Sequence, residues 1–460
     1  MRLSTRSIRV RVKGDLPITF SSERISAHGG LELFGRFLAL RGLAERAAKA
    51  FGGTALDGDY GAVRLLLAVV GLLVIGGMRV THLAFVGTDP VLLRFCGLHR
   101  LPADRTVVRW LKAFTPPLLE RLADLIRDLV HDDIERHRLP RLTVDLDGTV
   151  LRTGAKVDGA VRGFNPHHPK DPSYYPLTAH LAQLGQILRV WNRPGNVTDS
   201  HNADGFLRIV IGELRARFGR RLPIELRMDA AFFMPAIFAF LDGEPGLEYA
   251  VKVPMWKWLG LREVIASRRR WERVDAYVEG FETRLAIPQW NRTERVVVYR
   301  KRVPHESRKN FQLDLFDPAD GHFEYSAVAT NKDLRVRALW HFMAGRGAHE
   351  KTLAELKQAV AFDAIPTHDR HANAAWQMLS VLTLNLVRSF AIATGAAERR
   401  RTAKRTFRWV LPSLRTLRFE LIHQPARLVR PGGRPELRFA APEPVRLRIE
   451  RIQRYLARAA

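Results

Sequence analysis

The spacing of hydrophobic residues divides the chain into a helical first third and a mixed α/β middle. Up to about residue 138, apolar residues recur every three to four positions, which is the period of amphipathic helices. From residue 141 to about 253, runs with the alternation typical of strands are interleaved with helical stretches. The strands are predicted at 142–146, 177–183, 187–191, 224–228 and 247–253, and the helices at 203–218 and 235–241.

Three strands followed by a helix, a strand, a helix and a strand is the order of the ribonuclease H-like fold, so we predict an α/β core of that type. A strand-rich insertion is predicted to follow the core. Its β-branched and aromatic runs lie at 283–287, 295–299, 311–315 and 323–328. Helices return at 334–361, as one long segment, and at 372–393, where a nearly continuous apolar pattern predicts burial.

The chain is strongly basic, with 74 Lys and Arg against 47 Asp and Glu and a net charge of +27 at pH 7. A charge this large indicates a polyanionic partner such as nucleic acid. The longest apolar run, 65–78, is shorter than the ~20 residues that a spanning helix needs, so we expect a buried helix and no membrane. Cys96 is the only cysteine, which excludes a disulfide within the chain and favours the cytoplasm.

One predicted strand carries two carboxylates near its end. The run L-T-V-D-L-D-G-T at 142–149 alternates apolar and polar residues and then ends in turn residues, with Asp145 and Asp147 close to the turn. A carboxylate there costs desolvation unless a cation binds it, and metal ions and phosphoryl groups are often bound at such places. We assign the ligand to Asp147. Asp145 is either a supporting residue or the ligand itself.

Two further carboxylates are predicted to converge on Asp147. Asp229 directly follows the strand at 224–228, and Glu350 lies on the later helix. Three carboxylates from three elements can hold two divalent ions on either side of a scissile phosphate. Mg²⁺, or Mn²⁺ in its place, suits such an all-oxygen site.

Two basic residues share a helix face with Glu350. Arg346 precedes it by four positions and Lys357 follows it by seven, so all three lie on nearly the same side of the predicted helix. An ordinary row of surface ion pairs is the alternative explanation of this pattern.

A series of short blocks covers about residues 60–395. They are V-D-L-D-G-T-V (144–150), Y-Y-P-L (174–177), N-R-P-G-N (192–196), L-R-M-D-A-A-F (226–232), A-T-N-K-D-L (329–334), R-G-A-H-E-K-T-L-A-E-L-K (346–357) and A-A-W-Q-M-L-S-V-L-T-L-N-L-V-R-S-F (374–390). In order and spacing these blocks resemble the DDE transposases of bacterial insertion sequences, most closely the type named IS-thirteen-eighty.

The resemblance implies a catalytic and metal-binding triad of Asp147, Asp229 and Glu350. It also implies that Arg346 and Lys357 contact phosphates at the transposon end. Relatives carry a Tyr–Arg–Glu–Lys signature, and here the position of the tyrosine is Met343. If that tyrosine grips DNA beside a hairpinned end, this chain does so differently or not at all.

Other basic residues are candidates for DNA contact. Arg105, Arg109 and Lys112 lie on a short helix after the turn at 101–104, which is similar to a helix-turn-helix unit, although a solvated helix face explains them equally well. The arginine-rich tail at 396–460 is either a DNA-binding arm or a poorly ordered terminus. The tryptophans that either pack the insertion or stack on an unpaired base are Trp256, Trp258, Trp271 and Trp290.

The predicted organisation is an all-helical N-terminal DNA-binding region, a ribonuclease H-like core interrupted by a β-rich insertion, and a basic tail. The boundaries are 1–138 for the helical region, 139–253 and 327–395 for the two parts of the core, 254–326 for the insertion and 396–460 for the tail. We expect a cut-and-paste transposase of the nucleoid that acts as a homodimer on double-stranded DNA, both transposon ends and target.

Two alternatives stay open. V-D-L-D-G-T-V also matches the first motif of haloacid-dehalogenase-type phosphatases, in which the first aspartate is the nucleophile and the second the general acid. Those enzymes need a downstream acidic pair for Mg²⁺, for which the chain offers no convincing candidate, and a small phosphoester does not explain the charge of +27. The second alternative is a catalytically inactive DNA-binding relative.

Overall fold

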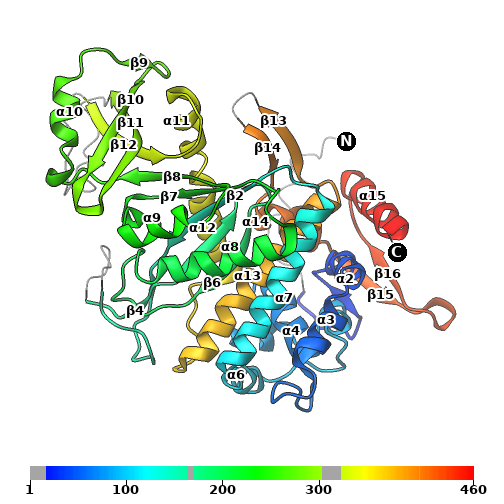
Figure 1. Cartoon of the computed structure of the whole chain (residues 1–460). Helices are drawn as coiled ribbons and strands as arrows, with labels where there is room; N and C mark the ends of the chain where they lie inside the picture. Colours follow the sequence, from blue (N-terminus) through cyan, green and yellow to red (C-terminus); the bar gives the residue numbers. More distant parts are fainter. Residues whose placement is uncertain (1–16, 164–169, 303–322, 403–404, 460) are drawn as a thin grey trace.

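A nine-stranded mixed sheet runs through the protein (Figure 1). The computed structural model describes residues 17–163, 170–302, 323–402 and 405–459. Across the sheet the strand order is β6-β5-β2-β7-β8-β12-β11-β10-β9. The strands are β2 Leu142–Gly148, β5 Leu177–Leu181, β6 Gln186–Trp191, β7 Ile224–Met228, β8 Leu247–Val253, β9 Glu272–Arg273, β10 Val278–Ile287, β11 Arg292–Arg302 and β12 Phe323–Thr330.

The first part of this sheet has the element order expected from the sequence. Strands β2, β5 and β6 are followed by α8 (Ala203–Phe218), β7, α9 (Pro235–Asp242) and β8. Strand β2 pairs antiparallel with β5 and parallel with β7, and β7 pairs parallel with β8. The carboxyl ends of β2 and β7 therefore lie at the same edge of the sheet. Apolar residues from one face of these strands form a buried cluster with α8 and α9.

The strand-rich insertion continues the same sheet. Strand β12 pairs antiparallel with β8, and β11, β10 and β9 follow outward in antiparallel order. Three of the predicted insertion strands are confirmed as parts of β10, β11 and β12, and the fourth, at 311–315, lies outside the described residues. Helix α10 (Leu261–Ser267) precedes β9, and a short two-stranded pair, β3 (Leu151–Arg152) with β4 (Ser173–Tyr174), follows β2.

Helix α13 (Arg370–Ala393) packs against several N-terminal helices and against β6. Its apolar residues and those of the N-terminal helices form one large hydrophobic cluster. The prediction that it is buried is confirmed, since the stretch that is apolar enough to cross a membrane is 100% buried.

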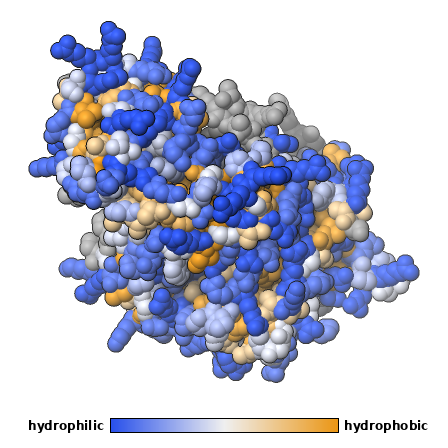
Figure 2. Space-filling view, in the orientation of Figure 1, coloured by the Kyte–Doolittle hydropathy of each residue, from blue (hydrophilic) through white to orange (hydrophobic). Residues whose placement is uncertain are grey.

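The face shown in Figure 2 is mostly hydrophilic. The N-terminal helices are α2 Leu31–Leu40, α3 Leu43–Phe51, α4 Ala62–Val74, α5 Pro90–Cys96, α6 Asp104–Lys112 and α7 Pro116–Arg136.

The single helix predicted at 334–361 is wrong, because the structure has two, α11 (Val336–Ala344) and α12 (Gly347–Val360). The helix tightens at the junction, where the N–H groups of Gly345 and Arg346 bond three residues back rather than four. Arg227 Nη1 donates to the Phe342 carbonyl at 2.8 Å, and so takes the acceptor that an α-helix would offer to Arg346. Arg346 becomes the N-cap residue of α12.

The C-terminal tail is largely structured, so of the two alternatives for it the poorly ordered terminus is wrong, while the DNA-binding arm stays a prediction. Strand β15 (Ala426–Val429) pairs with β1 (Ile25–Ser26) and with β16 (Glu436–Phe439), and α15 (Glu443–Ala459) packs on α2. Apolar positions at helical spacing supply the buried face of α15: Ile449, Ile452 and Leu456. The tail also contains β13 (Glu398–Thr402), β14 (Arg405–Val410) and α14 (Leu414–Leu417).

Candidate functional site

Three aspartates from three segments meet at the edge where β2 and β7 end. Asp147 is near the end of β2, Asp229 directly follows β7, and Asp199 lies in the loop between β6 and α8. A carboxylate oxygen of each lies within 4.8 Å of those of the other two. The structure thus brings together two of the three carboxylates chosen from the sequence and adds Asp199, which the sequence analysis did not single out.

Asp199 reaches the cluster because Gly148 has no side chain. A Cβ on Gly148 would lie 2.1 Å from Asp199 Oδ1 and 2.6 Å from the ring of Tyr175, well inside van der Waals contact. The Tyr175 hydroxyl donates a 2.9 Å hydrogen bond to Asp199 Oδ2. The other oxygen, Oδ1, is buried and has no hydrogen-bond partner among the described residues. A buried unpartnered oxygen beside two other carboxylates fits the requirements of a bound cation.

The guanidinium of Arg346 bridges the cluster from the start of α12. Its Nη2 lies 3.0 Å from Asp147 Oδ2 and 3.4 Å from Asp229 Oδ2, and only 8% of its side chain is exposed. Its Nη1 lies 3.8 Å from Glu350 Oε1. One guanidinium against these carboxylates leaves the site with an excess of negative charge.

Glu350 lies at the rim rather than inside the cluster. It is in the first turn of α12, and 67% of its side chain is exposed. It is not one of the three residues whose oxygens lie within 4.8 Å of one another. The predicted convergence of Glu350 with the two aspartates is therefore looser in the structure than the sequence suggested.

Burial and, to a lesser degree, neighbouring carboxylates raise the pKa values of two aspartates in the cluster. Burial, together with the charge of Asp229, raises the pKa of Asp147 from 3.8 to about 7, although Arg346 opposes the shift. Burial and Asp229 also raise the pKa of Asp199, against the hydrogen bond from Tyr175. A divalent cation would relieve both shifts, because it favours the ionised carboxylates.

Asp145, the alternative ligand, is part of a buried ion pair behind the site. Its side chain is 0% exposed and accepts hydrogen bonds from Arg227 Nε at 2.5 Å and Nη2 at 2.8 Å. The His180 ring lies against the same carboxylate, at 3.3 Å from Nδ1, and stacks on His349 of α12. Burial by itself would raise the pKa of Asp145, but Arg227 and His180 lower it to about 2. Asp147, not Asp145, faces the cluster.

Lys357 is half-buried beside the site, where its Nζ donates to the Val150 carbonyl at 3.1 Å. Burial lowers the pKa of its ammonium group. Met343, at the position of the signature tyrosine, is 8% exposed and belongs to a cluster with β10, β11 and α11. In this structure, therefore, Met343 packs against the sheet, and Lys357 is hydrogen-bonded to the backbone just after β2.

The basic residues of α6 lie away from the core. Arg105, Arg109 and Lys112 are exposed, while Val107 and Trp110 on the same helix are buried. The structure therefore leaves all three free to contact a ligand in solution.

The insertion tryptophans form aromatic packing near β7. Trp256 stacks on Trp258 with ring centroids 5.4 Å apart, and Trp290 lies 4.9 Å from the ring of Phe233. Trp258 keeps 43% of its surface exposed. Trp271 instead packs on Phe281 of β10.

The sequence analysis missed Asp199 because the hydrophobic residues around it recur with neither the period of a strand nor that of a helix. Asp199 follows N-R-P-G-N in a loop, and loop residues carry neither strand alternation nor a helical face. The one signal that could have identified Asp199 is its position, three residues after the block N-R-P-G-N at 192–196.

No curated protein sequence matches the chain. A solved structure titled "Cryo-EM structure of piggyBac transposase synaptic complex with hairpin DNA (SNHP)" is similar over 85% of this chain and 80% of that chain, with 14% identity and a TM-score of 0.42. A family model described as "Transposase DDE domain group 1" matches residues 9–460. The chain therefore belongs to this family, and the protein is a DDE transposase.

Proposed function

We propose that this transposase serves a bacterial insertion sequence of the IS-thirteen-eighty type, binds its terminal inverted repeats and moves it by cut-and-paste. The observation that carries the proposal is the cluster of Asp147, Asp199 and Asp229 against Arg346. Clustered carboxylates in a chain of net charge +27 suit an enzyme that holds cations and acts on a polyanion. The element order from β2 to β8 supports a ribonuclease H-like core, and we place the protein in the cytoplasm, on the nucleoid.

The residues present fit a divalent-metal site. Asp147 and Asp229 would hold two Mg²⁺ or Mn²⁺ ions, with Glu350 as the third carboxylate and Asp199 as a further ligand. When bound, such ions activate the attacking oxygen and stabilise the leaving oxygen of a scissile phosphate. Arg346 reduces the repulsion between the aspartates and stands where it can also neutralise charge on the phosphoryl group.

The proposed reaction begins with hydrolysis at the element end, which leaves a 3′-hydroxyl. That hydroxyl then attacks a phosphodiester of the opposite strand or of target DNA, so that a new phosphodiester bond forms while the 3′-oxygen of the attacked strand leaves. The two ends must be held together, so we propose a homodimer on double-stranded DNA. The exposed face formed by Arg105, Arg109 and Lys112 supplies phosphate contacts with a steep dependence on salt.

The test is cleavage of a supercoiled plasmid that carries both element ends, with Mg²⁺ or Mn²⁺. Wild type is expected to cut at the ends, and Glu350→Ala is expected to bind the ends without cutting them. Cleavage that survives Glu350→Ala but is lost in Asp199→Ala would move the role of third carboxylate to Asp199. Wild-type binding without any cutting would favour the inactive DNA-binding relative. Membership of the transposase family already decides against the phosphatase.

Cation binding is expected to depend on pH through Asp147. Because its pKa is about 7 without metal, a proton must leave before a cation binds, so affinity rises as pH increases through 7. With one proton displaced, affinity falls about tenfold for each pH unit below 7. Calorimetric titration with Mn²⁺ on both sides of pH 7 measures this, and affinity that does not change with pH would contradict it.

The same carboxyl has the opposite effect on the stability of the metal-free protein. A raised pKa means that the folded state holds the proton more tightly than the unfolded chain. The contribution of Asp147 therefore becomes more stabilising as pH falls from about 7 toward 3.8, and this gain is lost as pH rises again.

A further inference from the structure

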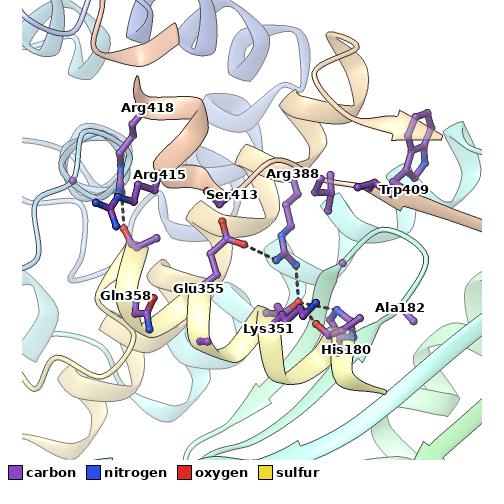
Figure 3. Close-up of a pocket in the computed structure, with 18 of the residues that line it drawn as sticks. His180, Ala182, Lys351, Glu355, Gln358, Arg388, Trp409, Ser413, Arg415 and Arg418 are labelled. Carbon is purple, nitrogen blue, oxygen red and sulfur yellow. Dashed lines mark hydrogen bonds and ion pairs between the residues drawn. The ribbon is translucent and has the colours of Figure 1, made fainter. Parts of the chain in front are cut away.

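A second basic feature is a cleft of about 790 Å³ on another flank of α12 (Figure 3). Its walls are formed by α12, by the segment from Trp409 to Arg418 and by the side chain of Arg388 from α13. The cationic side chains that line it are Lys351, Arg388, Arg415 and Arg418, and its acidic residue is Glu355. A cavity of this size is far larger than a single phosphate group needs, since drug-sized ligands occupy roughly 300–1,000 Å³.

Two of the cationic residues are held in the wall by the fold. Arg388 donates to Thr352 Oγ1 and to Glu355 Oε2, each at 3.1 Å. Arg418 donates to three backbone carbonyl groups. Glu355 also accepts the backbone N–H of Leu414 at 2.5 Å, so its charge is already used within the protein. The wall of the cleft is therefore fixed and positive.

The two other cationic residues are unused. Lys351 and Arg415 are exposed, and no hydrogen bond or ion pair of either side chain occurs within the part of the chain that the structure describes. Gln358, which is also exposed, lines the same cleft about two turns of α12 beyond Lys351 (Figure 3). Free cationic donors in front of a positive wall are typical of surfaces that follow a phosphate backbone.

Helix α12 connects this cleft to the carboxylate cluster. Successive helical residues point about 100° apart, so Glu350 faces the cluster while its neighbour Lys351 faces the cleft. The exposed ridge from Glu350 to Gln358 includes Ala354, and both Ala354 and Gln358 line the cleft. A chain of phosphates that crosses this ridge would go from the cluster into the cleft.

We propose that the cleft binds the sugar–phosphate backbone of the DNA strand that continues from the phosphate held at the carboxylates. Lys351 and Arg415 contact successive phosphates, and Arg388 and Arg418 supply the positive field behind them. This inference rests on the proposed function, because it needs a DNA strand at the cluster.

The charge test compares two double variants. Lys351→Ala with Arg415→Ala removes the unused cations, and Arg220→Ala with Arg221→Ala removes two exposed charges from the loop before β7, at the opposite end of that strand from Asp229. The cleft variant is expected to lose roughly tenfold in affinity for end DNA, and the magnitude of its salt dependence, the slope of log K against log [salt], is expected to fall by about 1.8, as for two lost phosphate contacts on duplex DNA. Equal affinity and equal slope in the two variants would overturn the proposal.

A cross-link locates the strand directly. Gln358→Cys places a thiol in the cleft, and the natural Cys96 is buried and does not compete. The end DNA carries an activated disulfide on phosphate tethers beyond the cleavage position, so the thiolate introduced by Gln358→Cys attacks that disulfide and displaces the small thiol. We expect this exchange to cross-link the DNA to Gln358→Cys and to give no such product with Arg221→Cys, whose thiol lies in an exposed loop before β7. If the wild-type protein cuts the ends but Gln358→Cys gives no cross-link, the assignment of the cleft is rejected and the proposed function stands. If the wild-type protein neither binds nor cuts the ends, the proposed function itself is rejected.

Discussion

Asp147→Asn is expected to abolish metal-dependent cleavage while DNA binding is retained. The amide keeps the size of the side chain but removes the negative charge that faces Asp199, Asp229 and Arg346. We expect the cleavage rate to fall by about 1,000-fold or more, the scale on which loss of a group that stabilises transition-state charge acts. The measurement is the rate of end-specific nicking of plasmid DNA under saturating Mn²⁺.

A surface change of the same chemistry serves as the control. Asp59→Asn alters an exposed carboxylate in the loop before α4 and is expected to cut at the wild-type rate. Gel-shift binding of the ends should be the same for both variants, because removing an acidic charge does not weaken phosphate contacts. Near-normal cutting by Asp147→Asn would show that this carboxylate is not a ligand.

Arg227→Met is expected to destabilise the fold by about 3–5 kcal/mol, the usual cost of removing one partner of a buried ion pair. The reason is Asp145, which is 0% exposed and would be left ionised without its bidentate partner. The loss would also free the Phe342 carbonyl at the junction of α11 and α12. Urea unfolding followed by circular dichroism measures the effect.

The double variant Arg227→Met with Asp145→Leu separates the cost of an orphaned charge from the value of the pair. Replacing both partners by apolar side chains removes the uncompensated charge, so most of the lost stability is expected to return. If Arg227→Met alone changes stability by less than about 1 kcal/mol, the range of an exposed pair, the two groups are not buried as described.

The sequence predicted those features that follow from short-range periodicity. Alternation at 142–146 and the turn residues after it located β2 and the carboxylate of Asp147, because a strand must bury one face and end somewhere. The apolar continuity of 372–393 likewise required a buried helix. The junction at Gly345 was not predictable, since its cause is a guanidinium from β7, more than one hundred residues earlier.

The carboxylate site was predictable only in part for the same reason. Asp145 and Asp147 are equivalent in a pattern of period two, and only the position of Arg227 on the neighbouring strand distinguishes the buried partner from the open one. Asp199 depends on the absence of a side chain at Gly148 and on a hydroxyl from Tyr175. Those are contacts between segments, which no local spacing encodes.

The pairing of β1 with β15 has a consequence for how the protein is made. Ile25 finds its partner Arg427, and α2 finds α15, only after nearly the whole chain has left the ribosome. During synthesis the N-terminal helices therefore expose apolar surface until α13, and later α15, have been made and can pack on them. A chain released early by a stop codon in the tail would lack this cover, and degradation rather than a persistent DNA-binding fragment is its expected fate.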